Sequence, residues 1–129
     1  MILLDTHIWV WWVQGSSRLN SEQRLTLQEA EGGSIYVSAI SLLEISRAVA
    51  LGGMQLPIPT QSWFETALTY PGIRLIGLTP DIATLAYHLP EPFHKDPADR
   101  VIVATALTLD VPLMSADQKI NEYPHIRHA

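Results

Sequence analysis

Four short apolar runs spaced along the chain constrain its fold more than any other feature. They occupy residues 2–4, 34–37, 73–78 and 111–114. Polar or turn-forming residues bound each run, which is typical of short buried strands. Because the sequence between the runs has helical character, the chain predicts strands that alternate with helices, and such strands pair in parallel.

The segments between the runs carry helix-start and helix-end signals. Asn20, Thr79 and Asp96 are suited to N-caps, and the last two precede a proline, which favours the first helical turn. We expect helices at residues 8–13, 21–31, 38–51, 60–70, 79–88 and 98–109, and an irregular segment at 89–94. The predicted fold is α/β, a three-layer α/β/α sandwich with a mostly parallel central sheet of four or five strands.

Composition and charge exclude several classes of protein. At 129 residues, 47% of them hydrophobic, the chain predicts one globular domain over residues 1–129. It has no cysteine, so disulfide scaffolds, thiol nucleophiles and cysteine-based metal sites are excluded. A formal net charge of −5 argues against a broad basic surface for nucleic acid. The apolar N-terminal stretch is too short to span a bilayer, so we expect a soluble, cytoplasmic protein without membrane contact.

Acidic residues lie at the ends of the predicted strands where α/β sheets bind ligands. Asp5 directly follows the first strand, and Asp117 follows the last. Glu44 lies in the helix after the second strand, while Asp96 and Asp99 begin the helix before the last. In a parallel sheet these carboxylates converge on one edge, where their repulsion requires protons or cations. Because Mg²⁺ and Mn²⁺ prefer oxygen ligands, the pattern predicts metal-assisted hydrolysis of a phosphodiester.

Each acidic residue also has an explanation in local helix geometry. Ser41 and Glu44 have the spacing of a capping box, and Asp96 can be a plain N-cap. Asp99 would favour the positive end of a helix dipole, and Asp117 would suit a turn. These explanations act one residue at a time, whereas the metal site explains why all five acids fall on one edge.

Four blocks of sequence, taken together, carry a family resemblance. They are ILLDTH at 2–7, SAISLLEI at 38–45, HKDPADR at 94–100 and LMSAD at 113–117. In this order and spacing they resemble the PIN-domain ribonucleases and, more narrowly, the VapC toxins of type II toxin–antitoxin pairs. The resemblance covers essentially the whole chain, and the third block is its most distinctive part.

The resemblance implies a metal-dependent endoribonuclease toxin that uses Mg²⁺ or Mn²⁺ and leaves a 5′-phosphate and a 3′-hydroxyl. The residues implied to bind metal and carry catalysis are Asp5, Glu44, Asp99 and Asp117, and Asp96 is an additional metal ligand. Those implied to support the site are Thr6, Ser38 and Ser115. Basic residues near the blocks are candidates for binding RNA phosphate, with local salt bridges as the alternative for the two arginines: Arg47, Lys95, Arg100 and Lys119.

Aromatic residues cluster in two of the predicted helices. For these residues burial in the core or at a subunit interface is favoured over stacking on RNA bases: Trp9, Trp11, Trp12, Trp63 and Phe64. His94 lies beside the acidic block, where contact with the substrate is one interpretation and a surface-loop position is the commoner one. The other four histidines show no metal-ligand spacing and are assigned no role: His7, His88, His125 and His128.

The resemblance also implies partners. VapC toxins are typically homodimers, and each is inhibited by a cognate VapB-type antitoxin that binds an apolar groove near the active site. This chain has no DNA-binding module, so any binding to operator DNA would come from the antitoxin. The alternative is a non-catalytic PIN-like protein-interaction module whose acids only cap helices. The presence of all four implied catalytic acids favours the enzyme.

Overall fold

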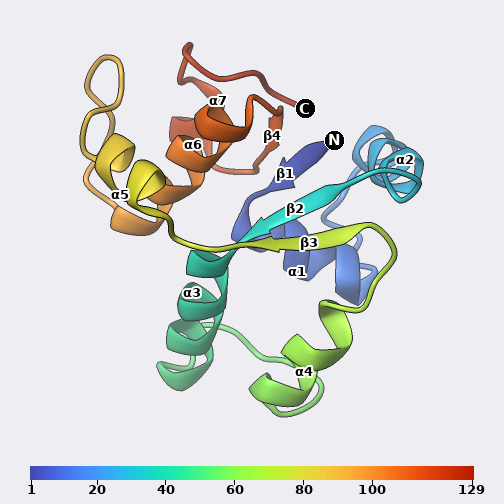
Figure 1. Cartoon of the computed structure of the whole chain (residues 1–129). Coiled ribbons are helices and arrows are strands. Elements are labelled where there is room, and N and C mark those ends of the chain that lie inside the picture. The colour runs from blue at the N-terminus through green and yellow to red at the C-terminus, as the bar shows by residue number, and fades with distance from the viewer.

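The strands of the sheet run parallel, and the first strand of the chain lies inside the sheet. The computed structural model describes all 129 residues (Figure 1). The strand order is β3-β2-β1-β4, and every neighbouring pair is parallel. The strands are β1 (Ile2–Leu4), β2 (Ile35–Ser38), β3 (Ile73–Ile76) and β4 (Leu113–Met114). The predicted parallel sheet is therefore confirmed, with four strands.

Helices cover both faces of this sheet. They are α1 (Thr6–Gln14), α2 (Ser21–Ala30), α3 (Ala39–Ala50), α4 (Thr60–Ala67), α5 (Pro80–Ala86), α6 (Pro97–Leu109) and α7 (Gln118–Asn121). Figure 1 shows α1, α2 and α4 on one side of the sheet and α5, α6 and α7 on the other, while α3 extends from the end of β2. The three-layer prediction is confirmed. None of the helices has the length and apolar character needed to cross a membrane.

Two features of the C-terminal part were not predicted. Helix α7 is a single turn, too short to show a hydrophobic period, and it begins where the Asp117 side chain accepts the N–H of Lys119. Beyond it, Leu113 donates its N–H to the carbonyl of Arg127, and Ala129 donates to the carbonyl of Leu113. The chain end thereby covers the exposed edge of β4, which would otherwise leave backbone groups unpaired.

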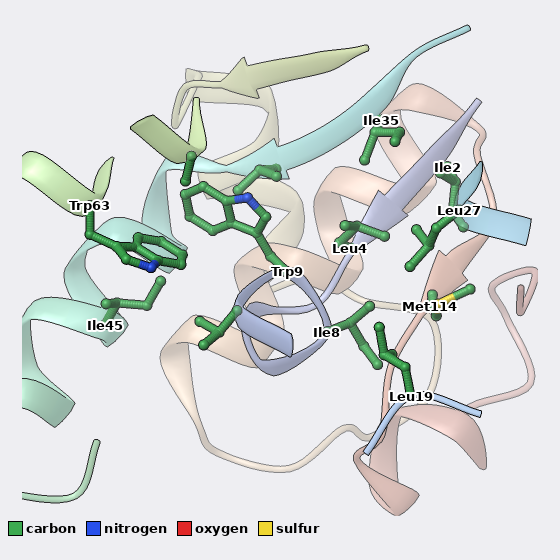
Figure 2. Packing of buried hydrophobic residues seen from close by; sticks show 13 residues of the cluster. Ile2, Leu4, Ile8, Trp9, Leu19, Leu27, Ile35, Ile45, Trp63 and Met114 are labelled. Atoms are coloured by element: carbon green, nitrogen blue, oxygen red, sulfur yellow. The ribbon is translucent and has the colours of Figure 1, made fainter. Parts of the chain in front are cut away.

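Buried apolar side chains pack against both faces of β1. Leu3 packs with the buried residues of α6 and α7, whereas Ile2 and Leu4 point to the opposite face, as alternation along a strand requires. Figure 2 shows the larger cluster, where the indoles of Trp9 and Trp63 meet edge to face with ring centroids 5.2 Å apart. Helix α1 is thus fixed against β1 directly after Asp5.

The order of the strands defines where a site can form. From β1 the chain proceeds to β2 and β3 on one side of it, and later returns to β4 on the other side. In sheets of this type ligands bind beyond the carboxyl ends of the strands, at the point where the strand order reverses. Here that point lies between β1 and β4.

Replacing Trp9 tests how much this core contributes. We expect Trp9→Ala to lower the free energy of unfolding by about 3–5 kcal/mol, because the lost indole leaves a cavity between α1 and α4. Leu25→Ala is the matched control, since Leu25 is 56% exposed on α2, and it should change stability by less than about 0.5 kcal/mol. Urea denaturation measures both. Equal stability of the two variants would contradict the packing described.

Candidate metal centre

Five carboxylates from four parts of the chain line one cavity at the carboxyl edge of the sheet. The cavity has a volume of about 420 Å³. Its acidic residues are Asp5, Glu44, Asp96, Asp99 and Asp117. The structure therefore brings together all the acids that were predicted from the sequence. The rest of the cavity wall is formed by His7, Trp11, Arg18 and Ala116.

Asp5, in the wall of the cavity, joins the end of β1 to β4 and the segment after it. One carboxylate oxygen accepts the N–H of Thr6, 2.8 Å away, and so caps α1. The other accepts the hydroxyl of Ser115, 2.6 Å away, and the same Ser115 oxygen accepts the N–H of Asp117. Ser115 therefore contacts the acid it was predicted to support, and it also orients the segment that carries Asp117.

Glu44 is positioned by Thr6 and not by its own helix. The Thr6 hydroxyl donates to a Glu44 carboxylate oxygen and lies 2.8 Å from the hydroxyl of Ser41. Helix α3 is instead capped by Ser38, whose side chain accepts the N–H of Ile40. The capping-box explanation of Glu44 is therefore wrong, because the helix starts three residues earlier than that motif requires. Ser38 forms no hydrogen bond to any of the five carboxylates.

Asp99 lies between two groups of side chains that could each hold a cation. Its N–H donates to Asp96, which caps α6 as the local explanation predicted. Ligand atoms of Glu44, Asp96 and Asp99 lie within 4.8 Å of one another. The same is true of His94, Asp99 and Asp117. Asp99 belongs to both groups, so the cavity could hold two adjacent cations that share its carboxylate.

His94 is the one residue of these groups that was not predicted as a metal ligand. Its Nε2 atom lies 3.0 Å from a carboxylate oxygen of Asp99, and its ring packs against Phe93 with centroids 4.4 Å apart. The contact with Asp99 arises from the path of the irregular segment before α6. No ligand spacing reveals such a path; the only signal was the position of His94 beside the acidic block.

Arg100 holds that irregular segment in place. Its guanidinium donates to the carbonyls of Ala86, Phe93 and His94 at 2.7, 2.9 and 3.1 Å, and it lies over the ring of Tyr87. Two roles were predicted for Arg100, binding of RNA phosphate and a local salt bridge. Its contacts differ from both, because Arg100 does not line the acidic cavity and forms no ion pair. The hydrogen bonds of its guanidinium all go to main-chain carbonyls.

The other basic candidates lie outside the acidic cavity. Arg47, Lys95 and Lys119 are exposed, and none of them lines it. Arg47 lines a neighbouring cavity of about 530 Å³, which also touches Glu44 and Asp96. Its side chain forms no ion pair, so the salt bridge considered for it is absent.

The carboxylates of the cavity have no Lys or Arg partner. The close contacts between basic and acidic side chains are His94–Asp99, His125–Glu91 and Arg127–Asp110, and only the last involves a Lys or Arg. Burial raises the pKa of the carboxyls of Asp5 and Glu44, and it raises the pKa of Asp99 to about 8, with the negative charge of Asp96 as the next cause. Buried acids without counter-charge favour bound cations, and oxygen donors in this number suit Mg²⁺ or Mn²⁺.

Comparison with known proteins identifies the family. The family model described as PIN domain matches residues 2–126, and the chain belongs to this family. It is 33% identical over 126 residues to Ribonuclease VapC22 of Mycobacterium tuberculosis, a match that covers 98% of this chain and 94% of that protein. The VapC resemblance inferred from the four sequence blocks is thereby confirmed.

Solved structures share the fold. The crystal structure of VapBC2 from Rickettsia felis, bound to a DNA fragment from its promoter, matches with a TM-score of 0.73 and 18% identity, covering 100% of this chain and 98% of that one. FitAcB from Neisseria gonorrhoeae matches with a TM-score of 0.64 and 21% identity, covering 93% and 90%. At these identities the likeness establishes the fold alone.

The raised pKa of Asp99 predicts how the metal-free protein responds to pH. Between the ordinary value of about 4 and the native value of about 8, native Asp99 keeps a proton that the unfolded chain has lost. Stability should therefore fall as pH rises through this interval. Asp99→Asn should reduce the fall and raise the melting temperature at pH 8, whereas Asp81→Asn, an exposed acid on α5, should not.

Thermal unfolding in excess chelator at a series of pH values measures this effect. A metal-free protein that becomes more stable between pH 4 and pH 8, or an Asp99→Asn variant with the same dependence as the unaltered protein, would contradict the assigned environment of Asp99.

Proposed function

We propose that this protein is a metal-dependent endoribonuclease, a toxin of the VapC type that hydrolyses RNA phosphodiester bonds. One observation carries the proposal: five carboxylates without a Lys or Arg partner surround one cavity at the switch point of the sheet. The name of its relative, Ribonuclease VapC22, supports the substrate class.

In this proposal Asp5, Glu44, Asp99 and Asp117 hold Mg²⁺ or Mn²⁺, and Asp96 is a further ligand. Such ions, when bound, activate a water and stabilise the charge that develops on the phosphate. A water oxygen bonds to phosphorus as the bond to the 3′ oxygen breaks, which leaves a 5′-phosphate and a 3′-hydroxyl.

The chain contributes the orientation of these carboxylates. Ser115 and the N–H of Thr6 fix both oxygens of Asp5, so this carboxylate cannot rotate away from the cavity. The hydroxyl of Thr6 fixes Glu44 in turn. Thr6 therefore contacts both acids and keeps a constant spacing between Asp5, which follows β1, and Glu44 on α3. A site for metal-assisted chemistry requires such fixed ligands.

The decisive variant is Asp5→Asn. The purified protein, free of any partner, is expected to cleave mixed transfer and ribosomal RNA with Mn²⁺ or Mg²⁺ and not with chelator. Asp5→Asn should lower cleavage by at least about a hundredfold, because even the loss of a group that only orients a metal ligand costs about 10–100-fold. Asp81→Asn, exposed on α5, is the matched control and should cleave normally.

Cleavage that persists in chelator or in Asp5→Asn would contradict the proposal. Cleavage of no RNA, together with tight binding of a protein partner, would favour the alternative, a non-catalytic PIN-like interaction module.

The proposed protein partner is a cognate VapB-type antitoxin. The cavity of about 530 Å³ adjoins the acidic cavity through His7, Glu44 and Asp96, and its apolar side includes Met54 and Leu43, which is 65% exposed. An apolar antitoxin segment placed there would obstruct access to the acids. By the same resemblance we propose a homodimer in the cytoplasm that does not bind DNA directly.

Leu43→Glu tests the antitoxin site. A charge in place of this exposed leucine should weaken binding of the cognate antitoxin by at least about tenfold, because the apolar contact is lost and a carboxylate is desolvated. RNA cleavage by the free variant should be unchanged, since Leu43 does not line the acidic cavity. Titration calorimetry measures the affinity, and unaltered binding would place the antitoxin elsewhere.

A further inference from the structure

Part of the lining of the acidic cavity is aromatic or basic rather than acidic. Beside the carboxylates it carries His7, Trp11 and Arg18. The rings of His7 and Trp11 have centroids 6.0 Å apart and are tilted by 55°. The Arg18 guanidinium carbon lies 5.6 Å from the centroid of the Trp11 ring. Two aromatic rings and one cation therefore form a continuous surface next to the proposed metal ligands.

Helix α1 places these side chains beside the metal centre. His7 and Trp11 are four residues apart and so share one face of the helix. Trp9 faces the opposite way and is fully buried against Trp63. The burial predicted for the aromatic residues, in the core or at a subunit interface, is confirmed in the core for Trp9 and Trp63. Trp11 also packs against this core, but it is only partly buried and lines the cavity.

A tight turn brings Arg18 back over Trp11. Gly15 ends α1 with a φ of 63°, a left-handed conformation that favours glycine. The N–H of Ser16 then donates to the carbonyl of Trp11, and the Ser16 hydroxyl accepts the N–H of Arg18. These contacts direct the chain across the end of the helix, so the fold determines the backbone position of Arg18, and its guanidinium reaches the face of Trp11 from there.

The charge of Arg18 is available to a ligand. It is the only Lys or Arg side chain that lines the acidic cavity. Its guanidinium takes part in no ion pair and donates no hydrogen bond within the protein. Arg100, by contrast, uses its guanidinium on three main-chain carbonyls. Arg18 therefore keeps its donors for a partner outside the chain.

We propose that Trp11 and Arg18 form a nucleotide subsite, in which an unpaired RNA base stacks on Trp11 and Arg18 binds a phosphate next to the cleaved one. The inference rests on the proposed ribonuclease function and specifies its substrate as unpaired RNA. Aromatic rings bind bases only when these are splayed out of a helix, and arginine binds phosphate through paired N–H groups. The subsite places one cation beside the five carboxylates of a chain whose net charge is −5.

Binding of two oligonucleotides separates the base from the phosphate contribution. One is a ten-nucleotide single-stranded RNA of mixed sequence, and the other is the same backbone with abasic riboses. Trp11→Leu should weaken binding of the first by about tenfold and leave the second unchanged, because only bases stack. Arg18→Gln should weaken both equally and reduce the salt dependence of binding by about 0.7 in the log–log slope, the value for one phosphate of a single strand.

Matched variants control for general effects. Trp12→Leu changes the neighbouring, partly buried tryptophan, which does not line the cavity. Arg74→Gln removes an exposed arginine on β3. Both should bind like the unaltered protein. Trp11→Phe keeps an aromatic face and should retain most of the affinity, and unchanged binding of the abasic strand by Trp11→Leu shows that this variant is folded. Fluorescence anisotropy of the labelled strands gives the affinities, with Ca²⁺ in place of the Mg²⁺ or Mn²⁺ used for cleavage.

Three results would overturn the subsite: no binding of RNA by the unaltered protein, equal affinities for Trp11→Leu and Trp12→Leu, or an equal loss for the base-bearing and abasic strands. If Trp11→Leu lost antitoxin binding and kept RNA binding, the surface would belong to the protein partner. Cleavage by the unaltered protein is measured separately. RNA binding that depends on Trp11, without any cleavage, would contradict the proposed function and leave the subsite standing.

Discussion

The parallel pairing of β1 with β2 on one side and β4 on the other is the constraint on which the rest of the structure depends. It places the carboxyl ends of three strands at one edge, so the residues that follow them meet there. Asp5 shows the consequence most directly, because its carboxylate receives one hydrogen bond from the start of α1 and another from Ser115 beyond β4. Residues 110 positions apart thus form one centre.

Such a centre is unfavourable for folding when no cation is present. The buried acids have no Lys or Arg partner, and burial raises the pKa of three of them. The apolar clusters on both faces of β1 supply the stabilisation that offsets this cost, since Leu3 and Leu4 are fully buried in opposite directions. Functional sites commonly keep groups, such as these acids, that lower the stability of the fold and are offset elsewhere.

The fold and the acidic residues of the site followed from local signals. Apolar runs located the strands, N-caps located α2, α5 and α6, and the ends of parallel strands explained why Asp5 and Asp117 would meet. The contacts that orient the site could not be predicted in this way. The bond from Thr6 to Glu44 and the approach of His94 to Asp99 depend on how α1, α3 and the segment before α6 pack. The contacts of Arg100 differ from both roles predicted for it, because the three carbonyls that accept its hydrogen bonds come together only in the folded chain.

The central claim is that the edge of the sheet is a centre for divalent cations. Electron paramagnetic resonance of Mn²⁺ tests it without reference to any substrate, because the sharp signal of the free ion is lost on binding. We predict that the protein removes this signal at stoichiometric Mn²⁺, that Mg²⁺ in excess restores it, and that Asp99→Asn binds Mn²⁺ much more weakly. A free-ion signal that is unchanged by the protein would contradict the account.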